Sequence, residues 1–224
     1  MCAPPWSGPR CSLLQEGAVT FPQGYGQAPH LTSWGGHILT EGDTHHLFVS
    51  RMTNNCSLRH WRTNSRIDHA VSDTISGPYT FSDVAVPVWA HNPDIVRLPG
   101  GTFALLHIGY GEGEDSGGDM CHNDVSYLDQ EDQEDQEDQE EGGRRRRGST
   151  IHTSHSLYGP WQPLEHNSIV CNNPSLWIHQ NQSIFLLCFV SNGLFDLKIA
   201  DNISGPWLPS TTIDVNAMVT PHVE

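Results

Sequence analysis

Three segments of the chain share one pattern: Ser72-Asp-Thr-Ile-Ser-Gly-Pro-Tyr79, Ser154-His-Ser-Leu-Tyr-Gly-Pro-Trp161 and Ala200-Asp-Asn-Ile-Ser-Gly-Pro-Trp207. In each of them Gly-Pro supplies a tight turn, and the aromatic residue that follows begins a short strand. A strand-like run precedes each segment, at residues 67–71, 150–153 and 195–199. A turn that recurs at the same place in successive units indicates an internal repeat.

A second element recurs upstream of these turns. The sequence His91-Asn-Pro-Asp-Ile-Val96 is followed by Gly-Gly and the apolar run 102–108, and Asn172-Asn-Pro-Ser-Leu-Trp-Ile178 is followed by a polar turn and the run 183–190. At the front of the chain, Ser33-Trp-Gly-Gly-His-Ile-Leu39 and the run 45–50 repeat this layout without Asn-Pro. Each unit therefore contains four strands.

The spacing of the repeat selects the fold. Asn92 and Asn173 are 81 residues apart, and a charged insert takes roughly 35 of these, so the corrected period is about 46 residues, as in a propeller blade. A β-sandwich can have similar strand spacing, but it would not repeat the same turn in each unit. We therefore predict an all-β chain, a β-propeller of four-stranded blades with about three blades present.

The predicted organisation is a poorly ordered N-terminal segment at residues 1–24 and a partial propeller at 25–224. Within the propeller we expect blade one at about 33–88, blade two at about 90–165, blade three at about 171–212 and the start of a fourth blade at 217–224. A propeller needs roughly four to eight blades to close. We therefore expect this chain to be a fragment or a truncated product.

The insert in blade two is a run of low complexity. Residues 112–147 hold 14 of the 26 acidic residues of the chain and four of its 11 basic ones, with a repeated Asp-Gln-Glu unit and then Arg144 to Arg147. Such a segment buries little apolar surface, so we predict that residues 112–148 are solvated, disordered and dispensable to the core. The alternative is a docking segment for a basic partner, and the neighbouring arginines weaken it.

Composition excludes several other classes of protein. No apolar run approaches the roughly 18–20 residues of a membrane-spanning helix, and the first ten residues lack the apolar core of a signal peptide. Outside the insert the charge is near that of an ordinary domain, without the basic stripe of a nucleic-acid-binding protein. The six cysteines show no C-x-x-C spacing, and Cys188, inside the longest apolar run, is expected to be a buried thiol.

Fourteen histidines raise the question of a metal site. The pairs His45/His46 and His152/His155 have odd separations, which direct them to opposite faces of a strand. No H-E-x-x-H motif is present. We therefore predict no metal and no cofactor.

Several spaced motifs resemble the family 43-like glycoside hydrolases, five-bladed propellers of the arabinanase, levansucrase and invertase type. The motifs are Ser33-Trp-Gly-Gly36, Trp61-Arg-Thr-Asn-Ser-Arg66 with His69-Ala-Val-Ser72, Ser76-Gly-Pro-Tyr79 and Ala90-His-Asn-Pro93. The resemblance runs from about residue 25 to residue 224, apart from the insert. It implies a five-bladed propeller and an inverting glycosidase whose acids lie on the propeller axis, about 6.5–9.5 Å apart with room for a water molecule.

The catalytic residues of that family match this chain only in part. The family's catalytic acid in blade one corresponds to Trp34-Gly35-Gly36, where this chain has no carboxylate. The family's Asp-Pro in blade three corresponds to Asn173-Pro174, where an amide replaces the carboxylate. The resemblance implies Glu224 as the general acid. Asp94, which follows Asn92-Pro93 and is expected near the axis, is a second catalytic candidate. The alternative for Asp94 is a solvated or capping side chain at the start of a strand.

Other residues near the motifs suit the binding of a sugar. Trp34 and Trp61 lie in polar surroundings where a sugar ring could stack on an exposed face, whereas Trp177 is expected in the core. The side chains that could bind sugar hydroxyls are His37, Asn64, Arg66, His91, Asn92 and Asn173. We expect Asn92 and Asn173 to lie at the central axis, because each begins a blade and precedes proline.

These observations predict a carbohydrate-active propeller, a glycoside hydrolase in its intact form, with an oligo- or polysaccharide as partner and neither nucleic acid nor membrane. The alternative is a glycan-binding propeller that has lost its catalytic carboxylates, so enzymatic activity stays open. A protein-interaction propeller is disfavoured because no WD or kelch signature is present. The compartment is open as well: the family resemblance favours secretion, but no signal peptide is visible.

Overall fold

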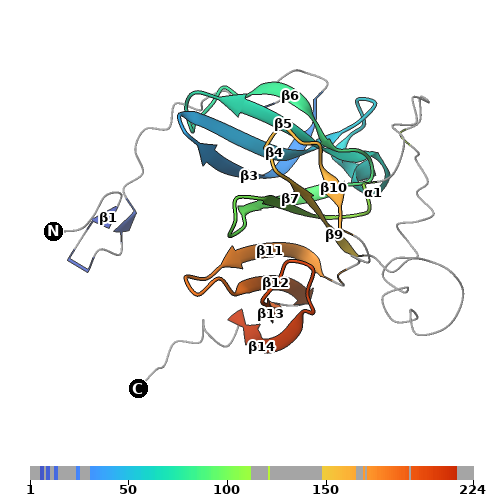
Figure 1. Ribbon diagram of the computed structural model, residues 1–224. Helices are drawn as coiled ribbons and strands as arrows, with labels where there is room; N and C mark the ends of the chain where they lie inside the picture. Colours follow the sequence, from blue (N-terminus) through green and yellow to red (C-terminus); the bar gives the residue numbers. More distant parts are fainter. Residues whose placement is uncertain are drawn as a thin grey trace, which may run out of the picture.

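The fold consists of three four-stranded antiparallel sheets stacked one upon the next (Figure 1). The computed structural model describes residues 6–7, 9–10, 13–14, 24–25, 31–111, 121, 148–164, 169, 171–191 and 193–215. Within these ranges the chain is all-β apart from the 3-10 turn η1 (Leu58–His60) and the short helix α1 (Trp61–Asn64). No helix in the described part is long and apolar enough to span a membrane.

The strands of each sheet follow one another in sequence. Blade one contains β3 (Ser33–Glu41), β4 (Thr44–Met52), β5 (Ser65–Ser72) and β6 (Thr80–Val86). Blade two contains β7 (His91–Arg97), β8 (Phe103–Ile108), β9 (Ser149–Ser154) and β10 (Gln162–Pro163). Blade three contains β11 (Asn172–Ile178), β12 (Ile184–Ser191), β13 (Leu194–Ala200) and β14 (Leu208–Asp214), and a separate pair joins β1 (Trp6–Ser7) to β2 (Leu13–Leu14). The predicted fold class is confirmed.

The repeated Gly-Pro segment forms the same turn in every blade. Gly77, Gly159 and Gly205 have φ angles of 82°, 78° and 81°, and each precedes a cis proline. The left-handed backbone suits glycine because it has no Cβ. A Cβ at Gly205 would lie 3.0 Å from the backbone nitrogen of Trp207, so the aromatic residue folds back over the glycine. This close approach explains why the sequence repeats the whole triplet.

The core lies between the sheets and is organised by β8. Phe103 and Leu105 pack toward blade one, and Ala104 and Leu106 pack toward blade three, as the two-residue period of a strand dictates. All four side chains are at most 2% exposed. Blade two is therefore buried on both faces. Trp177, predicted for the core, is instead 59% exposed, since its side of β11 faces away from blade two.

Disulfides correct the sequence prediction for cysteine. Cys188 is bonded to Cys171 within the core between blades two and three and is not a thiol. Cys121, inside the segment predicted to be disordered, is bonded to Cys56 of blade one. Gly148, at the end of that segment, accepts a hydrogen bond from the Gly109 amide at 3.1 Å. The remaining residues of the insert, 112–120 and 122–147, lie outside the described residues.

Two histidine pairs are buried on the second and third strands of blades one and two. His46 Nδ1 lies 2.9 Å from His69 Nε2, and the rings are stacked. His107 Nε2 lies 2.9 Å from His152 Nδ1. Full burial lowers the pKa of His107 to about 3, with a smaller contribution from the neighbouring His152, and burial also lowers the pKa of His46. The imidazoles of His46 and His107 are therefore neutral in the folded protein near neutral pH.

Acid should consequently destabilise the fold. Because the folded-state pKa of His107 lies below the unfolded value of about 6.5, the unfolded chain takes up the proton first. The stabilisation is complete above pH 6.5 and is lost as the pH falls toward 3, at up to about 1.4 kcal/mol per pH unit for each such group. Urea unfolding between pH 7 and pH 4.5 should show this decline. His107→Gln should reduce the slope, and the exposed control His155→Gln should keep it; equal slopes in both variants would contradict this assignment.

Candidate functional site

The first strands of the three blades, β3, β7 and β11, lie side by side and line the inner edge of the stack (Figure 1). Each carries a β-bulge close to its start, between Trp34 and Gly36 in β3, between His91 and Asp94 in β7, and between Asn172 and Ser175 in β11. A bulge redirects the side chains beside it. The three bulges therefore place the same strand positions of successive blades next to one another.

The residue at each bulge has a left-handed backbone. The φ angles are 48° for Gly35, 52° for Asn92 and 44° for Asn173. Glycine and asparagine are the residues that adopt this conformation most readily. Gly35 is thus the blade-one counterpart of the two asparagines, and a Cβ there would lie 3.1 Å from Asn92 Oδ1.

A chain of hydrogen bonds crosses all three blades at this level. Trp34 Nε1 donates to Asn92 Oδ1 at 3.0 Å, and Asn92 Nδ2 donates to Asn173 Oδ1 at 2.5 Å. The backbone N–H of Asn92 donates to Ser50 Oγ at 2.8 Å, and this hydrogen bond anchors the bulge to β4. The two asparagines named from the sequence are therefore in direct contact on the inner strands.

Aromatic side chains surround the asparagines. The ring of His91 lies 6.1 Å from that of Trp34 and 4.9 Å from that of Trp61, the latter edge to face. His91 Nδ1 lies 3.2 Å from Ser65 Oγ. Trp34 and Trp61 are each partly exposed. We call Trp34, Trp61, His91, Asn92 and Asn173 the axial cluster.

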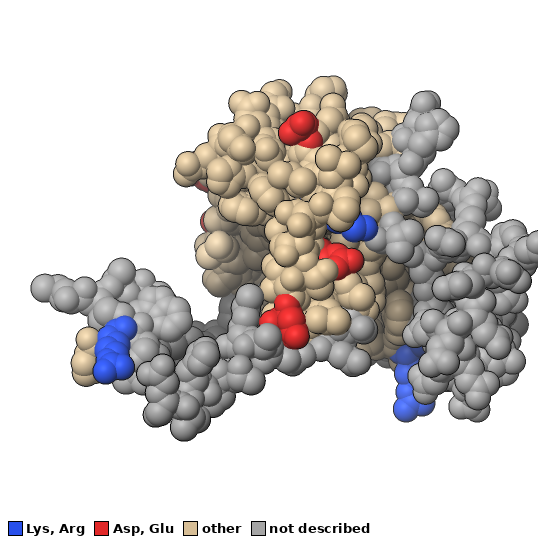
Figure 2. Space-filling model, turned by 90° about the horizontal axis from the view of Figure 1, so that it is seen from below, with Lys and Arg blue, Asp and Glu red and all other residues tan. Residues whose placement is uncertain are grey.

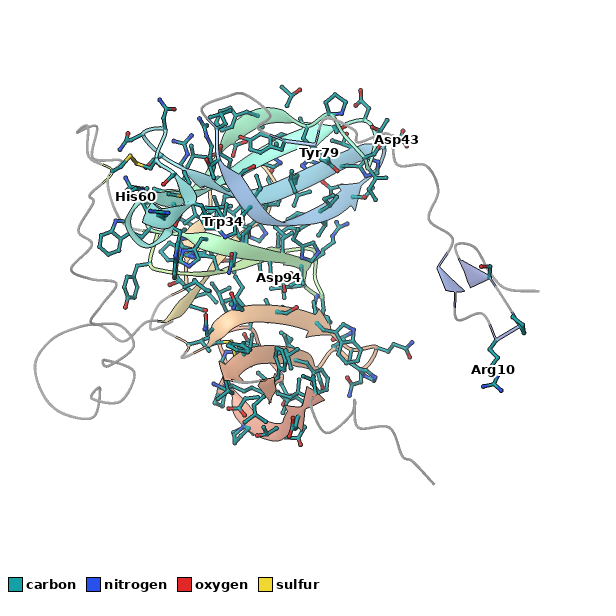
Figure 3. The ribbon with its side chains drawn as sticks, turned by 180° about the vertical axis from the view of Figure 1, so that it is seen from behind. Arg10, Trp34, Asp43, His60, Tyr79 and Asp94 are labelled. Carbon is teal, nitrogen blue, oxygen red and sulfur yellow. A yellow bond between two sulfur atoms is a disulfide. The ribbon has the colours of Figure 1, made fainter. Side chains whose placement is uncertain are left out.

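Asp94 is the first paired residue after the bulge in β7, and its side chain contacts residues of blades one and three (Figure 3). One carboxylate oxygen contacts His37 Nδ1 of β3, and the other accepts the amide hydrogen of Leu176 in β11 at 2.6 Å. The Asp94 side chain is only 10% exposed, whereas that of His37 is 40% exposed. Both carboxylate oxygens are occupied, so Asp94 is a buried crosslink between blades, and the solvated alternative is wrong.

Two of the residues predicted to bind sugar, Asn64 and Arg66, contact other side chains in the structure. Asn64 is buried, and its amide nitrogen lies 3.5 Å from Thr53 Oγ1. Arg66 Nε donates to Asp68 Oδ1 at 2.7 Å. Asp68 is fully buried and also accepts from Arg51 Nη1 at 3.1 Å and from Tyr25 OH at 2.6 Å. Burial and the bond to Asp68 raise the pKa of the Tyr25 hydroxyl.

Sequence reasoning did not find the Asp68 centre, because its partners come from three separate segments. Glu224, the candidate general acid, lies outside the described residues. The structure thus brings together Trp34, Trp61, His91, Asn92 and Asn173, sets His37 and Asp94 beside them, and places Asn64 and Arg66 in other contacts.

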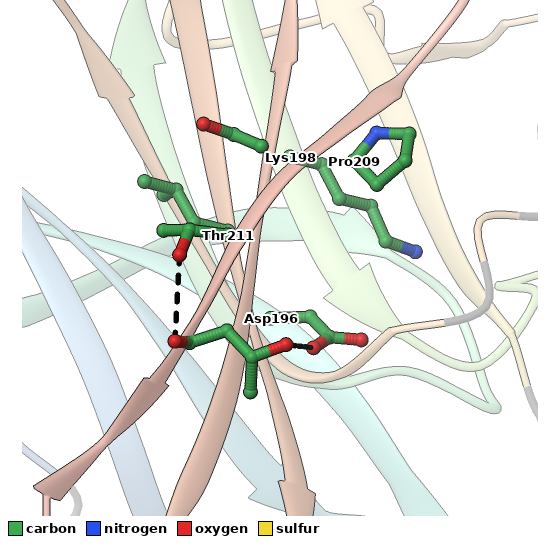
Figure 4. A pocket seen from close by; sticks show the side chains of 7 residues that line it. Asp196, Lys198, Pro209 and Thr211 are labelled. Atoms are coloured by element: carbon green, nitrogen blue, oxygen red, sulfur yellow. Dashed lines mark hydrogen bonds between the residues drawn. The ribbon is translucent and has the colours of Figure 1, made fainter.

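The surface has two shallow hollows away from the inner strands. One, of about 220 Å³, is lined by residues of β13 and β14, among them Asp196, Lys198 and Thr212 (Figure 4). The other, of about 390 Å³, is lined by Thr44, residues 71–74, Pro78 and Thr80. Neither includes a member of the axial cluster. Charged side chains are sparse and scattered over the described part of the face shown in Figure 2.

No known family's sequence profile matches the chain. No curated protein matches it either. Solved structures do match: Zg3597, a family 117 glycoside hydrolase from the marine bacterium Zobellia galactanivorans, is 14% identical with a TM-score of 0.54 over 81% of this chain. A GH43_1 enzyme from Xanthomonas citri, complexed with xylotriose, is 13% identical with a TM-score of 0.52 over the same share.

These matches show the fold. The chain has the architecture of family 43 and family 117 glycoside hydrolases, and it spans 56% and 55% of the length of those two structures. The fold implied by the sequence motifs is confirmed. At this level of identity, the likeness does not carry the activity of either protein to this chain.

The crosslinking role of Asp94 predicts a large effect on stability. Asp94→Ala would leave the buried Leu176 amide without its acceptor and His37 without its partner, so the free energy of unfolding should fall by about 2–4 kcal/mol. The matched control is Ser175→Ala, at the corresponding position of β11, where the side chain is exposed and the change should stay within about 0.5 kcal/mol. Urea unfolding at pH 7 measures both. Equal stability of the two variants would contradict the crosslink.

Proposed function

We propose that this chain is part of a carbohydrate-active propeller and that the axial cluster binds an oligosaccharide. The observation that carries the proposal is the convergence of a tryptophan, a histidine and two asparagines on the inner strands, with Trp61 of α1 packed against the histidine, in a fold shared with glycoside hydrolases. The convergence depends on bulges in three separate blades. A surface built in this way by three repeats is suited to a ligand that spans them.

The chemistry of the cluster suits sugars. A pyranose or furanose ring has an apolar face that packs on an aromatic side chain and hydroxyl groups that need both donors and acceptors. The partly exposed rings of Trp34 and Trp61 supply the first. An asparagine amide offers a donor and an acceptor on one short side chain. Because Asn173 uses its oxygen to accept from Asn92, its amide nitrogen remains to donate to a sugar hydroxyl.

The sugars bound in the similar solved structures suggest which substrates to test first. The GH43_1 enzyme from Xanthomonas citri was solved with xylose and with xylotriose. We therefore expect the axial cluster to accept short oligosaccharides of pentoses, and a panel of xylo- and arabino-oligosaccharides is the appropriate set of probes.

Binding should depend on the cluster and not on exposed tryptophan in general. Loss of one stacked ring or of one sugar hydrogen bond costs about 1–3 kcal/mol, so Trp34→Ala and Asn173→Ala should each weaken xylotriose binding roughly 5- to 100-fold. The control is Trp177→Ala, because Trp177 is exposed on blade three outside the cluster. Isothermal titration calorimetry measures the dissociation constants, and circular dichroism verifies folding. Equal weakening in all three variants, or no binding of any probe by the unaltered chain, would refute the proposal.

Hydrolysis is the second candidate function, and the shared fold with glycoside hydrolases favours it. An inverting reaction would need Asp94 as general base and Glu224 as general acid, about 6.5–9.5 Å apart. As described, both oxygens of Asp94 are engaged by His37 and by the Leu176 amide. A base role would therefore require the His37 contact to open when substrate binds.

A hydrolysis assay separates the two candidates. Release of reducing ends from the oligosaccharide panel should fall about 10²- to 10⁴-fold in both Glu224→Gln and Asp94→Asn if these residues transfer protons. Inversion should appear as the opposite anomer in the first product seen by NMR. Undiminished hydrolysis in Glu224→Gln would remove Glu224 from the mechanism. Binding without hydrolysis would assign the chain to the glycan-binding alternative.

A further inference from the structure

The loop between β4 and β5 contains a second cluster of reactive side chains, distinct from the axial cluster. Cys56 lies in this loop, is 1% exposed and forms a disulfide with Cys121. His60 ends η1 in the same loop, and Figure 3 shows it next to the disulfide. The sulfur atoms of both cysteines and a ring nitrogen of His60 all lie within 4.8 Å of one another.

The three ligand atoms are near enough to one another to surround one zinc ion once the disulfide is reduced. With Zn–S bonds of about 2.3 Å and Zn–N bonds of about 2.0–2.1 Å, neighbouring ligand atoms lie roughly 3.5–3.8 Å apart. Reduction of the disulfide would let the two sulfur atoms move apart to this separation, because each cysteine side chain could then rotate about its Cα–Cβ bond.

The loop is held in place by its own hydrogen bonds. Cys56 N donates to Thr53 O at 3.0 Å, His60 N donates to Ser57 O at 3.1 Å, and Thr53 N donates to Asn64 O at 2.7 Å. Asn54 and Asn55 have left-handed φ angles of 53° and 56°, which turn the chain sharply before Cys56. The positions of Cys56 and His60 are therefore set by the backbone and do not depend on the disulfide alone.

The imidazole of His60 also has the kind of contact that orients a metal ligand. Its Nδ1 lies 3.3 Å from the Ser57 hydroxyl and 3.3 Å from the Ser57 carbonyl oxygen. Metal-binding histidines commonly have such a contact from one ring nitrogen, which fixes the ring orientation while the other nitrogen faces the metal.

We propose that this cluster is a redox-controlled zinc site. A dithiol or phosphine reductant would donate two electrons to the Cys56–Cys121 bond, and two protons would complete the two thiols. Zn²⁺ would then displace these protons, bind both thiolates and the neutral imidazole of His60, and take a water molecule as its fourth ligand. Two thiolates with an imidazole favour zinc over calcium or magnesium. A disulfide oxidant such as oxidised glutathione would accept two electrons from the two thiolates, which would restore the Cys56–Cys121 bond and release Zn²⁺.

Either state keeps Cys121 attached to blade one. The disulfide joins residues 65 positions apart in the sequence, and the metal would replace that covalent link with coordination bonds. The site also adjoins Trp61 of the axial cluster, the residue that follows His60 and begins α1. The metal would therefore hold the start of the segment that carries this tryptophan.

Cobalt titration tests the proposal with the metal alone as probe. The chain reduced with a phosphine should bind one Co²⁺ with a visible d–d band and a thiolate charge-transfer band, and Zn²⁺ should bleach both; the oxidised chain should show neither. Cys56→Ser and Cys121→Ser should abolish the bands, and His60→Gln should weaken zinc affinity about 10- to 100-fold. The exposed control His179→Gln should have no effect. Bands that persist in the Cys56→Ser/Cys121→Ser double variant would overturn the proposal.

A second measurement keeps the test decisive if a cysteine variant fails to fold. In the reduced, unaltered chain, stoichiometric Zn²⁺ should protect Cys56 and Cys121 from alkylation by iodoacetamide, as mapped by peptide mass spectrometry. Alkylation of Cys56 and Cys121 at the same rate with and without zinc would refute the site. Neither experiment involves a sugar, so its failure would leave the proposed carbohydrate function untouched.

Discussion

The left-handed bulge at the start of each inner strand is the constraint on which the candidate site depends. Only residues that accept a positive φ angle can occupy it, and the chain uses glycine in blade one and asparagine in blades two and three. Because the bulge falls at the same place in β3, β7 and β11, the residues on either side of it meet across the blades. Gly35 leaves the space that Asn92 fills, and Asn92 in turn reaches Asn173. The proline after each asparagine supports this arrangement, because its ring cannot join the regular strand ladder.

Much of the fold could be predicted from the sequence because its signals are local. The Gly-Pro-aromatic turn repeats because the aromatic side chain folds over a glycine two residues earlier. The Asn-Pro motif marks the inner strands for a similar local reason. Several contacts that the sequence did not reveal are between distant segments: Asp94 with His37 and Leu176, and Cys56 with Cys121. The role of Gly35 is also not visible in the sequence, because this glycine contributes no functional group and only leaves space for the Asn92 side chain.

The buried and the exposed polar side chains of the site have different partners. Asp94 was a catalytic candidate because of its position, but its partners show a carboxylate that joins three blades. Asp68 similarly joins three segments through two arginines and a tyrosine. The buried carboxylates of this region thus serve as crosslinks, and the exposed chemistry is that of aromatic rings and amides. We propose that such a surface recognises hydroxyl groups and sugar faces without a formal charge of its own, and this proposal accounts for more of the described residues than proton transfer does.

The central claim is that the axial cluster binds a sugar, and the indole resonances of the tryptophans test it most directly. The chain has seven tryptophans, and the indole N–H of Trp34 is tied to Asn92. In a ¹⁵N–¹H correlation spectrum, titration with xylotriose or an arabino-oligosaccharide should shift the indole signals of Trp34 and Trp61 in a saturable manner and leave that of Trp177 in place. Shifts confined to Trp177, or no saturable shift with any member of the panel, would contradict this account.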